Sequence, residues 1–131
     1  MILVDTSALI AYLRGDENVA AAKLARVIDE GLPFGITPFT VQEVLQGART
    51  ERDFDRLREY LHTQRIYAPK DGLASYAKAA RLYRLCRTRG LTVRGSIDCL
   101  IAQVALEHGL LLLHDDRDFE ALAQVAELEF L

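Results

Sequence analysis

The feature that most constrains the fold is the start of the chain, where an apolar run ends abruptly on a carboxylate and two hydroxyls (MILVDTS, residues 1–7). A continuous Ile-Leu-Val run is typical of a strand that is buried on both faces, as in a parallel sheet. Such a strand delivers Asp5 to its carboxyl end, where open α/β sheets bind ligands. Asp5 is therefore the first candidate for a functional site, although a carboxylate there could equally cap the helix that follows.

The same pattern recurs late in the chain, where four leucines at 110–113 are followed at once by His-Asp-Asp-Arg-Asp at 114–118. We expect these two strands, the most apolar of the chain, to be central in the sheet. If they are neighbours, Asp5 and the later aspartates emerge side by side at one edge. One of those aspartates could instead cap the helix that begins near residue 119.

Strands and helices alternate along the whole chain, which predicts a parallel sheet with helices on both faces. At 131 residues the chain is expected to form a single domain, 1–131. Further strands are predicted at 33–36, 65–68 and near 127–130. Helices are predicted at 8–13, about 18–30, 38–48, about 52–62, 72–89, 97–108 and about 119–125. The expected N-caps are Thr6 or Ser7 for the first helix, Thr37 followed by Pro38 for the third, and Ser96 for the sixth.

The charge distribution is uneven although the net charge is only −3. No acid occurs between Asp71 and Asp98, while this stretch carries six basic residues, a pattern that suits a rim for phosphates beside a site for cations. No apolar run is long enough to span a membrane. No basic n-region precedes the first strand, and the two cysteines suit a reducing compartment, so we expect a cytoplasmic protein.

Carboxylates are the residues that could carry chemistry, and each also has an ordinary explanation. Glu43 lies nearly opposite the apolar stripe of its helix and would by default be solvated. Asp98 stands in a first helical turn, where acids are favourable, but it is wedged against the buried face. Gathering several such acids in one pocket requires cations, and oxygen ligands favour Mg²⁺ or Mn²⁺ over Zn²⁺.

Four segments resemble the motifs of PIN-domain nucleases, specifically the VapC toxins of toxin–antitoxin pairs. Residues 2–10 (ILVDTSALI) look like the family's opening, and 41–49 (VQEVLQGAR) resemble its second acidic motif. Residues 96–102 (SIDCLIA) match the third motif and 113–119 (LHDDRDF) the fourth. The resemblance spans the chain in order and spacing, and it implies a three-layer α/β/α fold with a central five-stranded parallel sheet.

The resemblance also implies a toxin that is a Mg²⁺- or Mn²⁺-dependent endoribonuclease, hydrolysing RNA by a metal-activated water. Thr6 and Ser7 would orient the metal ligands or a water without binding the metal themselves. Asp115 stands where Asn is commoner in the family, so Asp115 and Asp116 remain alternatives, of which we choose Asp116; His114 is expected to be structural. The implied catalytic residues are Asp5, Glu43, Asp98 and Asp116, and the implied metal ligands are Asp5, Asp98, Asp116 and Asp118.

The resemblance also implies the partners: RNA, a cognate antitoxin, and a second copy of the chain or a toxin–antitoxin hetero-oligomer. Arg94, near the mouth of the proposed site, is the best single candidate for RNA contact. Arg84 and Arg87 belong to a basic stripe that could also be an ordinary solvated face.

Three rival functions remain. A PIN-fold module without catalysis would bind RNA or protein only. A receiver-like signalling domain would need a phosphoacceptor Asp in the middle of the chain and a Lys at a strand end. Asp5 lies too close to the start of the chain to be that phosphoacceptor, and no Lys is suitably placed. A flap-type DNA nuclease would need DNA-gripping segments that a chain of this length has no room for.

Overall fold

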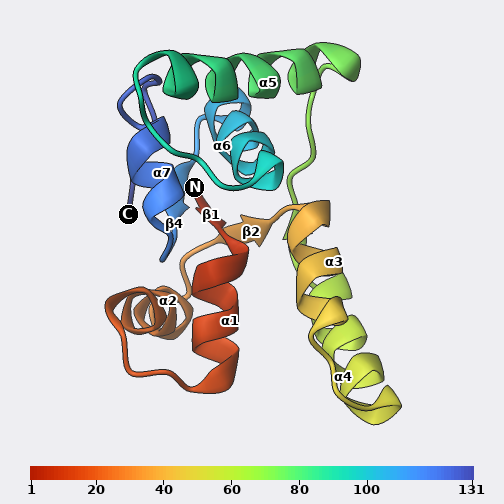
Figure 1. Ribbon diagram of the computed structural model, residues 1–131. Helices are drawn as coiled ribbons and strands as arrows, with labels where there is room; N and C mark the ends of the chain where they lie inside the picture. Colours follow the sequence, from red (N-terminus) through yellow and green to blue (C-terminus); the bar gives the residue numbers. More distant parts are fainter.

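The computed structural model describes all residues from 1 to 131 and has a sheet of four parallel strands between two layers of helices (Figure 1). The strand order is β3-β2-β1-β4, and every pairing is parallel. The strands are β1 (Ile2–Val4), β2 (Phe34–Ile36), β3 (Arg65–Ile66) and β4 (Leu111–Leu113). Because all four are parallel, their carboxyl ends lie at one edge.

Seven helices connect and cover these strands. On one face lie α1 (Thr6–Arg14), α2 (Val19–Asp29), α3 (Pro38–Gln46) and α4 (Glu51–His62), of which α3 and α4 pack together as a pair that extends from the body (Figure 1). On the other face lie α5 (Leu73–Thr88), α6 (Ser96–His108) and α7 (Arg117–Leu122). None of these helices has the length and hydrophobicity that a bilayer span requires.

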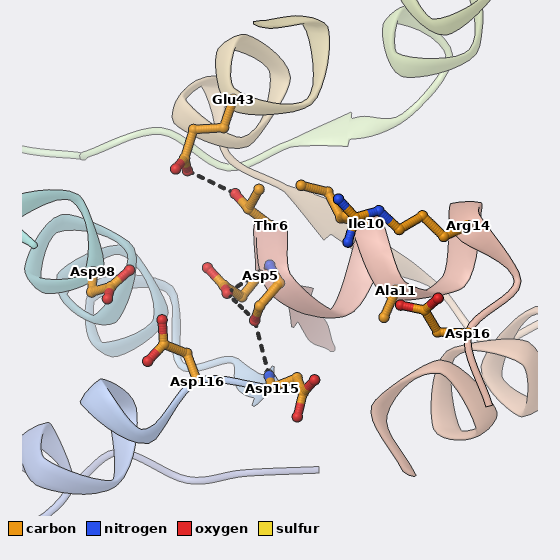
Figure 2. A pocket seen from close by; sticks show the side chains of 11 residues that line it. Asp5, Thr6, Ile10, Ala11, Arg14, Asp16, Glu43, Asp98, Asp115 and Asp116 are labelled. Carbon is orange, nitrogen blue, oxygen red and sulfur yellow. Dashed lines mark hydrogen bonds between the residues drawn. The ribbon is translucent and has the colours of Figure 1, made fainter. Parts of the chain in front are cut away.

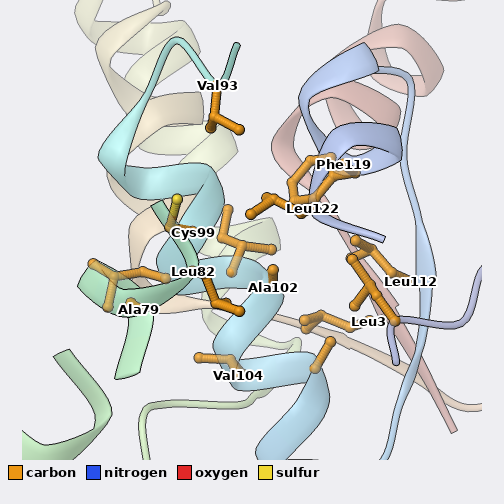
Figure 3. Close-up of a cluster of buried hydrophobic side chains, with 14 of the residues drawn as sticks. Leu3, Ala79, Leu82, Val93, Cys99, Ala102, Val104, Leu112, Phe119 and Leu122 are labelled. Carbon is orange, nitrogen blue, oxygen red and sulfur yellow. The ribbon is translucent and has the colours of Figure 1, made fainter. Parts of the chain in front are cut away.

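Alternation along the short strands builds two cores. Leu3 and Leu112 point into the larger core beneath α5, α6 and α7, where Phe119 is fully buried (Figure 3). Ile2 and Val4 point to the opposite face and pack against α1, α2 and α3. The first strand is therefore buried on both faces, as its continuous apolar sequence predicts.

The prediction of a five-stranded sheet is wrong, because the segment near 127–130 forms no regular strand. A turn extends from the end of α7 to Ala126, and only one parallel bridge, between Leu112 and Phe130, joins the last residues to β4. Leu112 N–H donates to Glu129 O (2.8 Å) and Leu131 N–H donates to Leu112 O (3.0 Å). β1 is central as expected, but β4 is the last regular strand, and this segment covers its outer side.

The helix starts also differ from expectation in detail. Asp5, not Thr6 or Ser7, is the N-cap of α1, and its side chain accepts a hydrogen bond from Ser7 N–H. Gly95, not Ser96, is the N-cap of α6 and offers no side-chain cap. Thr37 followed by Pro38 starts α3 as predicted. Asp5 thus caps α1, as one of its two interpretations predicted. The cap uses Oδ2 and leaves Oδ1 without a partner.

Candidate active site

A pocket of about 390 Å³ lies at the carboxyl edge of the sheet and gathers acids from four separate elements. Asp5 follows β1, Glu43 comes from α3, Asp98 from the first turn of α6, and Asp116 from the loop after β4. Figure 2 shows these four carboxylates around one opening. Parallel pairing of β1 with β4 brings Asp5 and Asp116 together, because Asp5 N–H donates to Leu113 O (2.9 Å) where the two strands end.

Asp5 is the best-defined member of the group. Its Oδ2 accepts two hydrogen bonds from Ser7, one from the backbone N–H (2.9 Å) and one from the hydroxyl. Its Oδ1 is fully buried and has no hydrogen-bond partner. Burial raises the pKa of Asp5 to about 6, although the Ser7 and Thr6 hydrogen bonds oppose that rise. A buried oxygen without a donor is unfavourable by itself and is suited to a cation.

Asp98, Asp116 and Asp118 form the second part of the site, with one carboxylate oxygen of each within 4.8 Å of the others. Burial, a side-chain hydrogen bond to Asp118 and the charges of the neighbouring acids raise the pKa of Asp98 to about 8. Such mutual destabilisation of carboxylates is relieved by a divalent cation. The donor set is all oxygen, which fits Mg²⁺ or Mn²⁺.

Asp116 and Asp115 play different roles although they are adjacent. Asp116 is the N-cap of α7, and its Oδ1 accepts from Asp118 N–H (3.0 Å). The same carboxylate faces Asp98 (Figure 2). Asp115 is exposed, and its Oδ2 accepts from Asn18 Nδ2 (3.3 Å). Asp116 is thus the one of the pair that takes part in the acid cluster.

Asp118 differs from the other acids because it is buried and does not line the open pocket. Arg94 satisfies it: the Arg94 backbone N–H donates to Asp118 Oδ2 (3.0 Å), and the guanidinium Nε lies 3.5 Å from Oδ1. Asp118 therefore lies behind Asp98 and Asp116, where it adds negative charge to the cluster.

Glu43 lies across the pocket on an exposed part of α3, as expected for a residue opposite the apolar stripe. It is nevertheless held, because the Thr6 hydroxyl donates to Glu43 Oε1 (2.8 Å). The same hydroxyl lies 3.0 Å from Thr40 Oγ1, which is buried and also contacts Thr37. Sequence reasoning missed Thr40; its position three residues after the N-cap Thr37 is the only local signal for it.

His114 is a structural residue in this geometry, as predicted. Its ring packs against Phe119 and Phe130, with centroid distances of 5.1 and 4.5 Å. Its Nδ1 accepts from Asp116 N–H (3.1 Å), and burial lowers the pKa of His114. A neutral imidazole thus fixes the backbone at Asp116.

The three predicted RNA-contact residues do not lie together. Arg94 lies beside the acids, where its guanidinium Nη2 donates to Asp116 Oδ1 (3.2 Å). Arg84 and Arg87 line a separate, mostly apolar hollow of about 560 Å³ between α5 and α6. Arg14 at the end of α1 and Asp16 just after it, by contrast, line the acidic pocket.

Comparisons with known proteins identify proteins that share this fold and sequence pattern. Residues 2–125 match the family described as PIN domain. Ribonuclease VapC11 of Mycobacterium tuberculosis is 34% identical, over 98% of this chain and 96% of that protein. The structure of VapBC2 from Rickettsia felis, bound to a promoter DNA fragment, aligns with a TM-score of 0.74 at 15% identity over 100% of this chain and 98% of that one. A toxin–antitoxin complex from Klebsiella pneumoniae aligns with a TM-score of 0.67 at 25% identity, over 91% and 90% of the two chains.

Proposed function

The chain belongs to the PIN-domain family, and we propose that it is a toxin of the VapC type, an endoribonuclease that depends on Mg²⁺, with Mn²⁺ as the alternative ion. The observation that carries the metal dependence is the buried, unpartnered Oδ1 of Asp5 at the edge of an acid cluster. The nuclease activity is supported by the curated relatives, which are ribonucleases.

Asp5, Asp98, Asp116 and Asp118 would hold the cation; one oxygen of each of the last three lies within 4.8 Å of the others. When bound, the cation supplies a Lewis acid that lowers the pKa of a water and neutralises charge on the phosphate. Ser7 fixes the rotamer of Asp5, since its hydroxyl and backbone N–H both bind Oδ2 and leave Oδ1 directed to the site. Rigid support of this kind keeps a ligand in place without relying on the metal.

Glu43 is proposed as a fourth catalytic acid on the opposite wall. Its hydrogen bond from Thr6 keeps one carboxylate oxygen occupied, and its exposure leaves the other available to water in the pocket. Glu43 would orient an attacking water and accept its proton, while Arg94 at the rim would offer a charge to the RNA backbone.

A cognate antitoxin is the proposed partner, because the solved structures of this fold include toxin–antitoxin complexes. A hollow of about 670 Å³ lies next to the acidic pocket, and Asp16 lines both. Tyr12 of α1 and the small apolar residues at the start of α2 form its apolar part, and the connection between the two helices forms its polar part. An apolar segment of a partner in this hollow would lie beside the acids. Copurification of the toxin with an antitoxin, and loss of cleavage in the complex, tests this.

The test of activity is to incubate the purified protein with an RNA and a DNA of the same sequence, in EDTA, Mg²⁺ or Mn²⁺. Only RNA with a divalent cation should be cleaved. Asp98→Asn and Glu43→Gln should reduce the rate by roughly 10²–10⁴-fold, the range for a positioned catalytic group. Asp29→Asn, an exposed aspartate on α2, is the matched control and should cleave normally. Cleavage that persists in EDTA, or in Asp98→Asn, would contradict the proposal.

A further inference from the structure

Arg94 makes every ion pair found at the acid cluster. The structure contains four salt bridges in all, and the two that do not involve Arg94 join exposed neighbours on α2 and on α4. The Arg94 guanidinium contacts both Asp116 (3.2 Å) and Asp118 (3.5 Å). Its single positive charge therefore offsets part of the repulsion among three close carboxylates.

The two halves of Arg94 are held very differently. Its backbone N–H donates to the nearly inaccessible carboxylate of Asp118, so the backbone is fixed. Its side chain is 67% exposed and reaches the acids from the solvent side. The guanidinium is thus solvated on its outer side although Asp118 is buried, and an ion pair whose cation is exposed in this way is weak and exchanges readily. The guanidinium can thus leave the acids while the loop that carries it stays in place.

Asp116 is the carboxylate at which the two cations would compete. Its Oδ1 accepts from both Asp118 N–H and Arg94 Nη2, and Asp116 belongs to the group whose oxygens converge within 4.8 Å. A divalent ion bound there would place two positive charges next to the guanidinium, and like charges repel. Binding of the ion therefore opposes the Arg94–Asp116 contact.

We propose that Arg94 is an exchangeable counter-cation: it pairs with Asp116 and Asp118 when the divalent cation is absent and is released to bind an RNA phosphate when the cation binds. This inference rests on the proposed function, because it assigns the regulation of the same site. The exchange makes strong binding of RNA conditional on a loaded site, and it keeps the empty acid cluster partly neutralised. Arg94 is in this sense a positioning residue that links two binding events.

The first test is calorimetric titration of Mn²⁺ into the wild type, Arg94→Ala and Arg94→Lys, without RNA. Removing a competitor should tighten Mn²⁺ binding by Arg94→Ala by roughly two- to fivefold, the scale of an exposed ion pair. Arg94→Lys keeps the positive charge but cannot contact both Asp116 and Asp118, so its Mn²⁺ affinity should lie between those of the wild type and Arg94→Ala. Arg56→Ala removes a charge from an exposed site on α4 that makes no ion pair, and should leave affinity within about twofold of the wild type. Weaker or unchanged Mn²⁺ binding by Arg94→Ala would overturn the exchange, since a merely structural Arg94 would hold the ligands in place.

The second test measures the salt dependence of binding to a fluorescent single-stranded RNA by anisotropy, in EDTA and in Ca²⁺, which replaces Mg²⁺ to slow cleavage. One phosphate contact on single-stranded RNA contributes about 0.7 to the slope of log K against log salt. The wild-type slope should exceed that of Arg94→Ala by about this amount in Ca²⁺ and by much less in EDTA. An equal difference in both conditions would overturn the proposal.

Failure of the exchange is distinguishable from failure of the proposed function. If the wild type binds no divalent cation, both the proposed metal-dependent function and the exchange are wrong. If the wild type binds the cation and cleaves RNA, but Arg94→Ala binds it no tighter, only the exchange falls. If Arg94→Ala binds the cation more tightly, and its salt slope is smaller than the wild-type slope in Ca²⁺ but not in EDTA, the exchange holds whether or not RNA is cleaved.

Discussion

The hydroxyl of Ser7 accepts a hydrogen bond from the backbone N–H of Asp115 (2.9 Å), a residue 108 positions further along the chain. The same hydroxyl donates to Asp5 Oδ2. One small side chain in the first turn of α1 therefore connects the acid after β1 with the loop after β4. The two most important acidic segments of the site are joined through it, and the geometry of the site depends on it.

Ser7→Ala should weaken metal binding and cleavage more than it weakens the fold. Loss of the two hydroxyl hydrogen bonds leaves Asp5 Oδ2 held only by the backbone N–H of residue 7, and it lets the loop after β4 relax. We expect a 10–100-fold loss in metal affinity or activity, as for other residues that orient ligands. The free energy of unfolding should fall by about 1–2 kcal/mol. Calorimetry with Mn²⁺, cleavage assays and thermal melts measure the three effects; cleavage at the wild-type rate would contradict the role given to Ser7.

Asp5→Asn should abolish the stabilisation by divalent cations. Without metal at pH 8 the variant should be more stable than the wild type by about 1–2 kcal/mol, because it replaces a buried, unpaired charge with a neutral amide. Thermal melts in EDTA and in Mg²⁺ measure both quantities. Asp29→Asn should show the wild-type gain in Tm with Mg²⁺. A full gain in Asp5→Asn would mean that the cation binds elsewhere.

Stability in EDTA should fall as the pH rises from about 4 to about 8. The folded protein raises the pKa of Asp5 to about 6 and the pKa of Asp98 to about 8, so it holds protons that the unfolded chain releases near pH 4. The folded state binds more protons in this window, and the free energy of unfolding therefore decreases with pH.

The difference in Tm between the wild type and Asp98→Asn isolates this contribution from other groups. In EDTA, the Tm of the variant should rise relative to that of the wild type between about pH 4 and 8. Saturating Mg²⁺ should make the wild type the more stable of the two, because it favours the ionised carboxylates. A difference that does not change with pH would show that Asp98 ionises normally in the folded protein.

Gly35→Ala should destabilise the fold without touching the acids. A Cβ at this position would lie 2.8 Å from Arg65 O in β3 and 2.5 Å from the Tyr67 ring, so β2 and β3 could not keep their spacing. Overpacking of this kind costs about 1–3 kcal/mol. Gly47→Ala meets only Val44 O at 3.4 Å and is the control, expected within about 0.5 kcal/mol of the wild type. Denaturant melts compare the two variants.

Much of the fold could be predicted from the sequence, because its signals are local. The apolar run at Ile2–Val4, the N-cap at Thr37 and the glycine that ends α1 at Gly15 each act within a few residues. The burial of β1 and most of β4 was also predictable, since fully apolar strands favour a buried position, but their pairing was only one possibility until the structure showed it. The absence of a regular fifth strand was not predictable, because pairing of the last residues depends on where the turn after α7 ends.

The sequence by itself determined which residues could form the site: a strand that ends at Asp5, a second that ends before Asp115, and acids at Glu43 and Asp98 on helices of predictable period. Local patterns of burial fix these positions. Only the tertiary structure decided how they meet. It gave Asp116 rather than Asp115 to the cluster, joined Ser7 to Asp115, and placed Arg94 on two carboxylates more than twenty residues away. Such contacts join segments distant in sequence, and their geometry follows from the packing of α6 and α7 on the sheet, which no local pattern encodes.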